Sequence, residues 1–284
     1  MKTEHDLSVL IAVLGVTRSG YHAWVQAEAG VRAQGDAELL PEIAALHAEH
    51  RGRYGAPRLH RELASQGRKH GCKRIARLMK NAGLRGLSSK RYVPRTTQSD
   101  HDQPIAPNVL AERSAPTGPN QIWVNDLTYV PTAEGWLYVG VVLDLWSRQV
   151  VGWATGDTLH ARLSGNALKM ALRQRQPPRG CLHHSDRGVQ YASREHRELL
   201  ALAGLEPSMS RAGNPYDNAA MESFMATYKR ECVRLAETAG GYATRAEASN
   251  DFFGYVEKYY NRVRRHSALG YKSPVDFENQ LRRR

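Results

Sequence analysis

The chain is poor in cysteine and has no long apolar run, and these two shortages exclude several classes of protein. Its 284 residues include three cysteines, Cys72, Cys181 and Cys232, which we expect to be small buried side chains. An odd number at such wide spacing offers neither a disulfide framework nor a CxxC pair, and Cys72 alone cannot complete a zinc site with His47 and His50. We therefore expect no zinc. No run approaches the roughly 18 apolar residues of a membrane span, and the charged start MKTEHD is no signal peptide, so a cytoplasmic protein without membrane contact is expected.

Acidic residues are also in short supply, with 28 Asp and Glu against 40 Lys and Arg and a net charge of +12. The excess is divided unevenly along the chain. Residues 1–100 hold 17 basic and 9 acidic side chains, residues 257–284 hold 8 and 3, and residues 101–256 hold 15 and 16. Two basic arms around a nearly neutral middle favour a polyanionic partner such as nucleic acid, although a solvated basic surface is the alternative.

Residues 1–95 show no strand-like alternation and predict an all-helical region of short helices separated by Gly and Pro. Apolar side chains recur at helical spacing over residues 7–14 and stop at Gly15. Thr17 can then cap a second short helix. The pair is a candidate helix-turn-helix.

A second set of helices follows, in which Pro57 stands at an expected first helical position and a later helix carries the apolar stripe of Ile75, Leu78 and Met79. This later helix ends at Gly83. Basic side chains occupy its remaining faces: Lys73, Arg74, Arg77 and Lys80. A recognition helix in the major groove of DNA would present such residues, whereas a solvated helix face is the plainer alternative.

Composition then changes twice, and the changes mark a second domain. Residues 96–118 are rich in Ser, Thr, Pro, Asn and Asp and predict a linker. IWVNDLTYV, WLYVGVVLDLW and QVVGWAT predict three consecutive antiparallel strands. A helix over 160–173, a strand at CLHHS, a helix over 193–203, a strand at EPSMS and helices over 218–260 follow. Residues 119–284 thus have the element order of a ribonuclease H-like α/β domain, a mixed sheet with flanking helices, ending in a basic helical tail.

Three carboxylates in this domain suit a catalytic metal centre. Asp126 lies in the middle of the first strand, where a buried carboxylate without a counter-ion would be costly. Asp186 follows the CLHHS strand, and Glu222 lies 36 positions later on a helix. Lys229 is two helical turns beyond Glu222 and therefore on the same helix face. Enzymes that cut phosphodiesters use such carboxylates to hold divalent ions.

The segments around these residues resemble a known family. WVNDLTYV, HHSDRGVQY, SMSRAGNPYDNAAMESF and YYNRVRRHSALGYKSP, together with RGRYGAPRLHRELASQG in the front region, are similar to the DDE transposases of bacterial insertion sequences. Within that family they resemble the second-reading-frame (OrfB-type) product with a retroviral-integrase-like core. Asn125 and Tyr228 depart from the residues more usual there, but neither is a proposed metal ligand.

The resemblance implies a metal triad of Asp126, Asp186 and Glu222, with Lys229 contacting the transposon end. It also implies Mg²⁺ or Mn²⁺, two ions, as cofactor. DNA would be the substrate, bound by a homo-oligomer that brings two ends together, with a first-reading-frame protein as partner or fusion. Such a protein would work on the nucleoid of a bacterial cell.

Other polar residues near the proposed site have structural alternatives. Asp144 falls at a strand end, where an Asp usually ties the turn together. Asn218 can cap the helix of Glu222 or support the site beside it. His183 and His184 face opposite ways on a strand, so one should lie in the core and the other, His184, behind the metal ligands.

The C-terminal segment 259–266 is basic and aromatic, and helical spacing predicts a helix suited to phosphate contact and base stacking. Arg262 and Arg265 are its expected DNA contacts. Packing of its tyrosines into the core is an equally good interpretation.

The function that accounts for all of these features is a DNA transposase, which cleaves element ends and joins them to new DNA in a metal-dependent reaction. A ribonuclease H-like nuclease that only hydrolyses would keep the triad but have less need of a helix-turn-helix front. A catalytically silent DNA-binding regulator would keep the basic arms but should lack the three carboxylates.

Overall fold

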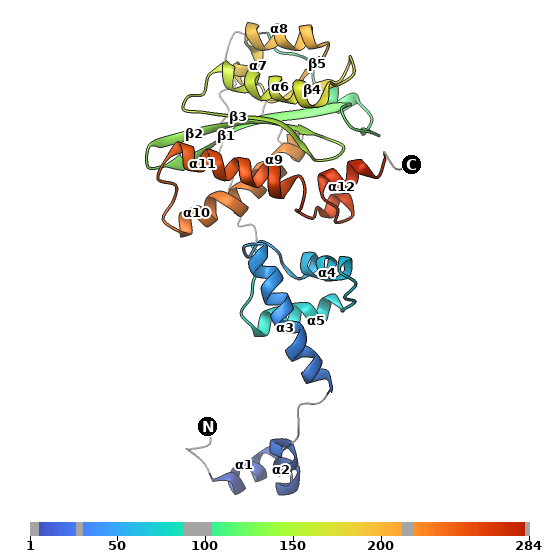
Figure 1. The fold of residues 1–284 in the computed structure, drawn as a ribbon, viewed down its shortest axis with the longest axis vertical. Helices are drawn as coiled ribbons and strands as arrows, with labels where there is room; N and C mark the ends of the chain where they lie inside the picture. The colour runs from blue at the N-terminus through green and yellow to red at the C-terminus, as the bar shows by residue number, and fades with distance from the viewer. Residues whose placement is uncertain (1–5, 27–30, 88–103, 212–217, 282–284) are drawn as a thin grey trace. The chain divides into compact units, whose positions relative to one another are not determined.

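The computed structural model describes residues 6–26, 31–87, 104–211 and 218–281. Contacts within the chain divide it into two compact units, Met1–Leu87 and Ser88–Arg284 (Figure 1). The division falls close to the end of the region that the sequence predicts to be all helical.

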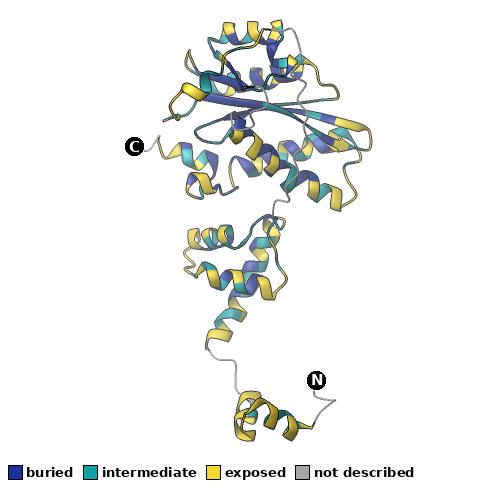
Figure 2. Ribbon diagram, turned by 180° about the vertical axis from the view of Figure 1, so that it is seen from behind, coloured by how far each residue is buried: buried dark blue, intermediate teal, exposed yellow. Residues whose placement is uncertain are grey.

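The described residues of the first unit are helical, as predicted. Thr17 caps the second helix, since its Oγ1 accepts a hydrogen bond of 3.0 Å from the backbone N of Gly20. Most side chains of the first two helices are exposed (Figure 2). The helices are α1 (Leu7–Leu14), α2 (Arg18–Gln26), α3 (Val31–Glu49), α4 (Ala56–Ser65) and α5 (Cys72–Asn81).

The helices α3, α4 and α5 pack on one another around a small apolar core. The predicted stripe of Ile75, Leu78 and Met79 is buried in it, which confirms that face of α5. Pro57 is the second residue of α4 rather than the first, because the helix begins at Ala56. Proline fits there equally well, since the first-turn N–H groups have no partner inside the helix.

A five-stranded mixed sheet forms the centre of the second unit, with the strand order β3-β2-β1-β4-β5. The first three strands are antiparallel neighbours, whereas β4 pairs parallel with β1 and β5 parallel with β4. This confirms the predicted meander and mixed sheet. The strands are β1 (Ile122–Thr132), β2 (Gly135–Asp144), β3 (Val150–Gly156), β4 (Leu182–Ser185) and β5 (Glu206–Met209).

Helices cover both faces of the sheet and leave its strands buried (Figures 1 and 2). One face packs against α6 (Ala161–Arg175), α7 (Val189–Ala192) and α8 (Arg194–Ala203), and the other against α9 (Ala219–Tyr228) and α11 (Arg245–Phe253).

Alternation along β1 decides which residue faces which layer. Trp123 joins the core under α6 and α8, whereas Val124 joins the core under α9. Asp126 therefore points to the α9 side of the sheet, because side chains two apart on a strand share a face.

The helix α6 lies directly on the backbone of β3 at Gly152. A Cβ atom on this residue would come within 2.3 Å of the carbonyl oxygen of Ala167 and 2.6 Å of the backbone N of Ala171. Only glycine permits this approach of helix to strand.

After α9 the chain continues through η3, α10 (Arg234–Thr238), α11, η4, η5 (Ser267–Leu269) and α12 (Pro274–Asn279). Two of these elements, η3 (Lys229–Val233) and η4 (Gly254–Tyr260), are π-helical. The predicted helix over 259–266 is wrong beyond Tyr260, where the chain turns.

Asn261 explains why the helix ends there. Its side-chain amide accepts a 3.0 Å hydrogen bond from the backbone N of Val150 and donates one of 2.9 Å to the backbone O of the same residue. Of the two interpretations of this segment, core packing fits Tyr260, which is buried. Three residues later, the buried Arg264 donates two hydrogen bonds to the carboxylate of Glu231.

The linker predicted over residues 96–118 is described from Pro104 onward, and this part packs against the edge strand β5. The backbone N of Met209 donates to the O of Pro107, and Ser208 Oγ accepts from the N of Leu110. The short helix η1 (Val109–Glu112) follows this contact. The packing covers an edge strand, which would otherwise expose unpaired backbone groups.

Cys181 and Cys232 are buried as predicted, whereas Cys72, the first residue of α5, is only partly buried. None of the helices in the described ranges is both long and apolar enough to span a bilayer.

Candidate active site

Asp126 is the central side chain of the candidate site. It lies on β1, the middle strand of the sheet, opposite Val141 of β2, and one of its carboxylate oxygens accepts a 2.8 Å hydrogen bond from the backbone N of Leu127. Burial raises the pKa of Asp126 to about 8, and the nearby charges of Asp186 and Glu222 contribute to the rise. The carboxylate of Asp126 is therefore half-buried and lies near two other negative groups.

Asp186 follows the end of β4, the parallel neighbour of β1. The register pairs Val124 with His184, so continuing both chains by two residues brings Asp186 level with Asp126. Asp186 Oδ1 accepts a 2.9 Å hydrogen bond from the backbone N of Gly188, which holds the turn into α7. The sequence placed this residue at a strand end, and the structure confirms that position.

Glu222 comes from a different layer. It lies in the first turn of α9, on the side of the sheet to which Asp126 points, and its charge contributes to the raised pKa of Asp126. Its own pKa is raised by partial burial. The positive end of the α9 dipole lies at this turn and favours the approach of negative groups. Residues 212–217, which precede α9 and include Asp217, lie outside the described residues.

The charges of Asp186 and Glu222 act on Asp126, yet among the described residues no group of three or more His, Cys, Asp and Glu side chains is arranged to hold a metal ion. The donor set nevertheless fits a hard divalent cation such as Mg²⁺ or Mn²⁺, which prefers carboxylate oxygens. A cation would also relieve the repulsion that raises the pKa of Asp126.

Lys229 is a basic residue on which the charge of Asp126 acts. Its ammonium nitrogen is 4.9 Å from the centre of the Tyr129 ring, within the range of a cation–π contact. Burial lowers the pKa of Lys229, while the charge of Asp126 acts in the opposite direction. Lys229 follows the last residue of α9, so it stands two turns from Glu222 as the spacing predicts.

Asn218 does not cap α9 with its side chain, contrary to one of the two interpretations from sequence. Its Nδ2 instead donates a 3.2 Å hydrogen bond to the backbone O of Asn125, the residue before Asp126. The buried Asn125 in turn donates from Nδ2 to the backbone O of His184 at 2.7 Å. These two amides link β1, β4 and the start of α9. Sequence reasoning noted Asn125 only as a departure from the family pattern and missed this role.

His184 is fully buried and binds two serines. Its Nδ1 lies 2.9 Å from Ser208 Oγ and its Nε2 lies 3.0 Å from Ser210 Oγ. It therefore ties β4 to β5 two residues before Asp186.

Asp144, the rival carboxylate, accepts hydrogen bonds from the N and Oγ of Ser147 and from the N of Asn120. It holds a turn, as the plainer interpretation states.

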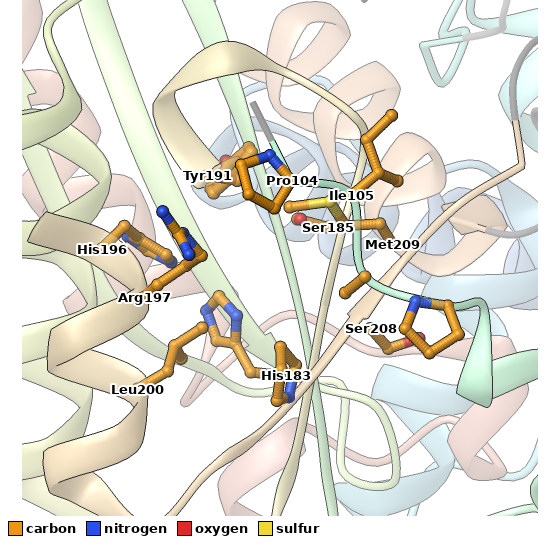
Figure 3. A pocket seen from close by; sticks show the side chains of 13 residues that line it. Pro104, Ile105, His183, Ser185, Tyr191, His196, Arg197, Leu200, Ser208 and Met209 are labelled. Atoms are coloured by element: carbon orange, nitrogen blue, oxygen red, sulfur yellow. The ribbon is translucent and has the colours of Figure 1, made fainter. Parts of the chain in front are cut away.

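A cavity of about 250 Å³ lies on the α7–α8 side of the sheet, and its lining includes Ser185, the residue before Asp186 (Figure 3). His183, Tyr191 and His196 are three of its lining residues. Burial lowers the pKa of His196 to about 4 and that of His183 well below its usual value, so both imidazoles are neutral at neutral pH. Burial, followed by the charges of Asp126 and Asp186, raises the pKa of Tyr191.

The predicted DNA contacts of α5 fall into two groups. Lys73 and Lys80 are exposed. Arg74 and Arg77 are partly buried and pair with Asp36 of α3, with N–O distances of 2.7 and 2.5 Å. Sequence reasoning did not anticipate Asp36 as their partner, because the two helices are about 40 positions apart along the chain.

The predicted C-terminal contacts are also placed differently from each other. Arg262 is exposed and donates from Nε to the backbone O of Glu257 at 3.0 Å. Arg265 is partly buried, and its Nη1 donates to the backbone O of Tyr271 at 3.2 Å.

Comparisons with known proteins agree with this architecture. Family models described as integrase core domain match residues 116–215 and 203–274, and one described as HTH-like domain matches residues 34–92. The simian T-cell lymphotropic virus intasome, solved in complex with PP2A regulatory subunit B56 gamma, contains a chain 15% identical with a TM-score of 0.50, covering 83% of this chain and 74% of that one. This likeness shows the fold, a ribonuclease H-like integrase core.

Two relatives match nearly the whole length. The insertion element IS600 uncharacterized 31 kDa protein of Shigella sonnei is 47% identical over 268 residues, which are 94% of this chain and 97% of that protein. Transposase InsF for insertion sequence IS3A of Escherichia coli (strain K12) is 39% identical over 281 residues, 98% of this chain and 96% of that one.

Proposed function

The chain belongs to the family of insertion-sequence transposases that includes InsF, and on that premise we propose that Asp126, Asp186 and Glu222 are its DDE triad. The observation that supports the proposal is the convergence of three carboxylates, from the middle of β1, the end of β4 and the first turn of α9; burial, Asp186 and Glu222 together raise the pKa of Asp126. Perturbed titration at a cluster of like charges is typical of a functional site rather than of a stabilising contact.

Asp126, Asp186 and Glu222 would hold the divalent ions, two Mg²⁺ or Mn²⁺. Such ions polarise the phosphate, activate the attacking oxygen and stabilise the leaving oxygen.

The chain's own residues would position the DNA. The ammonium of Lys229, which lies over the Tyr129 ring and feels the charge of Asp126, would contact a phosphate of the element end. Asn218 and Asn125 would keep the start of α9, and with it Glu222, at a fixed distance from β1. The site would first free a 3′ hydroxyl at the element end and then align it with a second phosphodiester. Direct transesterification needs neither ATP nor a covalent enzyme intermediate.

The basic front unit would bind the element end through α5, and the basic C-terminal segment would add phosphate contacts through Arg262 and Arg265. Two element ends must meet for joining, so at least two copies of the chain would act together, with a first-reading-frame protein as a further partner or fusion. This DNA substrate would place the protein on the nucleoid of a bacterial cell. Its affinity for DNA should fall steeply with salt, in proportion to the number of phosphates it neutralises.

The test is cleavage and joining of a labelled duplex that carries the element's own end, taken from the DNA flanking the gene, with Mg²⁺ or Mn²⁺. Asp126→Asn, Asp186→Asn and Glu222→Gln should each abolish both reactions while DNA binding survives. Glu237→Gln is the matched control, because Glu237 is an exposed carboxylate on the following helix α10. It should leave both reactions unchanged.

Three outcomes would contradict parts of this proposal. Activity that persists in one triad variant removes that residue from the ligand set. A wild-type chain that hydrolyses DNA but never joins a hydroxyl-ended oligonucleotide is a nuclease. A chain that binds the element end but neither cuts nor joins it is a DNA-binding regulator, or needs its partner protein.

A further inference from the structure

The carboxylate of Asp36 on α3 binds two arginines of α5, and this contact has no role in the triad chemistry. We propose that Asp36 fixes Arg74 as a guanine-reading side chain, which makes the contact between α3 and α5 a determinant of DNA sequence specificity. The inference rests on the proposed function, because it requires that the front unit binds an element end.

The hydrogen bonds show which part of Arg74 is held and which part remains available. Asp36 Oδ1 accepts from Arg74 Nε at 2.7 Å, and its Oδ2 accepts from Arg77 Nη2 at 2.5 Å. The two terminal nitrogens of Arg74 have no hydrogen-bond partner among the described residues. A guanine is read by two parallel N–H donors of one guanidinium, directed at its O6 and N7 atoms. The terminal edge of Arg74 offers such a pair.

The position of Arg74 on α5 suits this role. The helix begins at Cys72, which puts Arg74 in its first turn and Arg77 one turn later. Recognition helices contact base edges mainly through residues near their N-terminus. The side chain of Arg74 is also 32% exposed, whereas that of Asp36 is 15% exposed. The acceptor is therefore the more enclosed partner and the guanidinium the more accessible one.

Gly35 supplies a second constraint on the same guanidinium. A Cβ atom at this position would lie 3.1 Å from Arg74 Nη2. Glycine weakens a helix interior, and α3 contains one where the guanidinium of Arg74 approaches its backbone. Two adjacent residues of α3 thus restrict Arg74, one by a hydrogen bond and the other by close approach.

The shared carboxylate also changes the electrostatic contribution of the pair. Hydrogen bonds from Arg77 and then Arg74 hold the pKa of Asp36 below its usual value, so the carboxylate stays ionised. One negative charge then offsets half of the charge on the two guanidinium groups. Attraction to phosphates does not depend on the DNA sequence, whereas the binding of a guanidinium held in a fixed orientation to a base edge does. Asp36 should therefore lower affinity for unrelated DNA and raise discrimination between sequences.

The experiment measures binding of the full-length chain to a fluorescent duplex of the element's own terminal repeat and to a set of duplexes that each change one base pair. The variants are Asp36→Asn, which keeps the shape but removes the charge, and Arg74→Lys, which keeps the charge but removes the fork. Glu38→Gln is the control, because Glu38 is an exposed carboxylate on the same helix.

The wild-type chain and Glu38→Gln should lose about 5- to 150-fold in affinity when one particular G·C pair is changed. In Asp36→Asn and Arg74→Lys, this loss should shrink toward one-fold at that pair alone, while other pairs keep their effect. Lys73 is exposed and would contact a phosphate, so Lys73→Ala should instead lower the affinity for every duplex by the same factor.

Two results would overturn the inference. One is undiminished discrimination at every pair in Asp36→Asn or in Arg74→Lys. The other is a uniform loss at all pairs in both, as expected if the ion pairs only tie α3 to α5. If Asp36→Asn unfolds the front unit, Arg74→Lys decides alone, because it leaves the contact of Asp36 with Arg77 in place. Metal-dependent cleavage of the same duplex is scored separately: a chain that discriminates but never cuts contradicts the transposase chemistry and not the role of Asp36.

Discussion

The buried ion pair between Arg264 and Glu231 should be one of the most sensitive contacts of the core. Two hydrogen bonds of 2.9 and 2.8 Å join the guanidinium to the carboxylate, and the Tyr255 hydroxyl donates to the same carboxylate at 3.0 Å. The two charged side chains are 5% and 1% exposed. The pair links η3, which begins with Lys229, to the chain that follows η4.

Arg264→Met should destabilise the second unit by about 3–5 kcal/mol, because it leaves the Glu231 carboxylate buried without its counter-ion. A domain is typically stable by only about 5–15 kcal/mol, so the loss is a large fraction of the total. The double variant Glu231→Gln/Arg264→Met removes both charges. It should cost much less than the sum of the two single variants, since no unpaired charge remains.

Urea denaturation followed by tryptophan fluorescence measures this effect, because four of the five tryptophans lie in the second unit. Arg262→Met is the matched control, since Arg262 is exposed two positions earlier; it should change stability by less than about 0.5 kcal/mol. A loss below about 1 kcal/mol in Arg264→Met would refute the reasoning. A loss in the double variant equal to the sum of the two single losses would also refute it, because the two side chains would then not be coupled.

Three further predictions concern acid stability, packing and the site. The pKa of His196 is about 4 in the folded chain against 6.5 for an unperturbed histidine, so the unfolded state binds the proton first as the pH falls. The free energy of unfolding should therefore be about 2 kcal/mol lower at pH 5 than above pH 6.5. Urea titrations of His196→Gln should lack that part of the decline. Gly152→Ala should cost about 1–3 kcal/mol through its clash with Ala167; an unchanged melting temperature would contradict this. Asn218→Ala should slow cleavage without weakening DNA binding, because its bond to Asn125 positions α9; unaltered single-turnover rates would show that the bond does not matter.

The sheet and most helices could be predicted from the sequence because their signals are local. β1, β2 and β3 are runs of seven to eleven residues rich in β-branched and aromatic side chains, and the stripe of α5 follows helical spacing. Of the three proposed carboxylates, Asp126 stands out by its chemistry, whereas the resemblance to a known family implies the set of three. Asp126 interrupts an apolar strand, and such a position is costly without a cation.

What the sequence did not predict depends on contacts between distant segments. Asn261 ends the C-terminal helix by pairing with Val150, which lies 111 positions earlier. Asp36 pairs with Arg77 across 41 positions. The side chain of Asn218 donates a hydrogen bond to the backbone of Asn125 and does not cap its own helix. Propensity describes neighbours along the chain and contains no information about partners that only the packing of the fold brings together.

The number of residues in the π-helical segment η3 sets the position of Glu231 relative to Glu222. Each residue of an α-helix advances the chain by about 100° around the axis, and a π-helical turn accommodates more residues than an α-helical one. Deleting one residue within Lys229–Val233 should therefore restore a regular helix and rotate the following side chains away from Arg264, while Glu222 stays in place. Natural variation at this point should conserve the length of the segment.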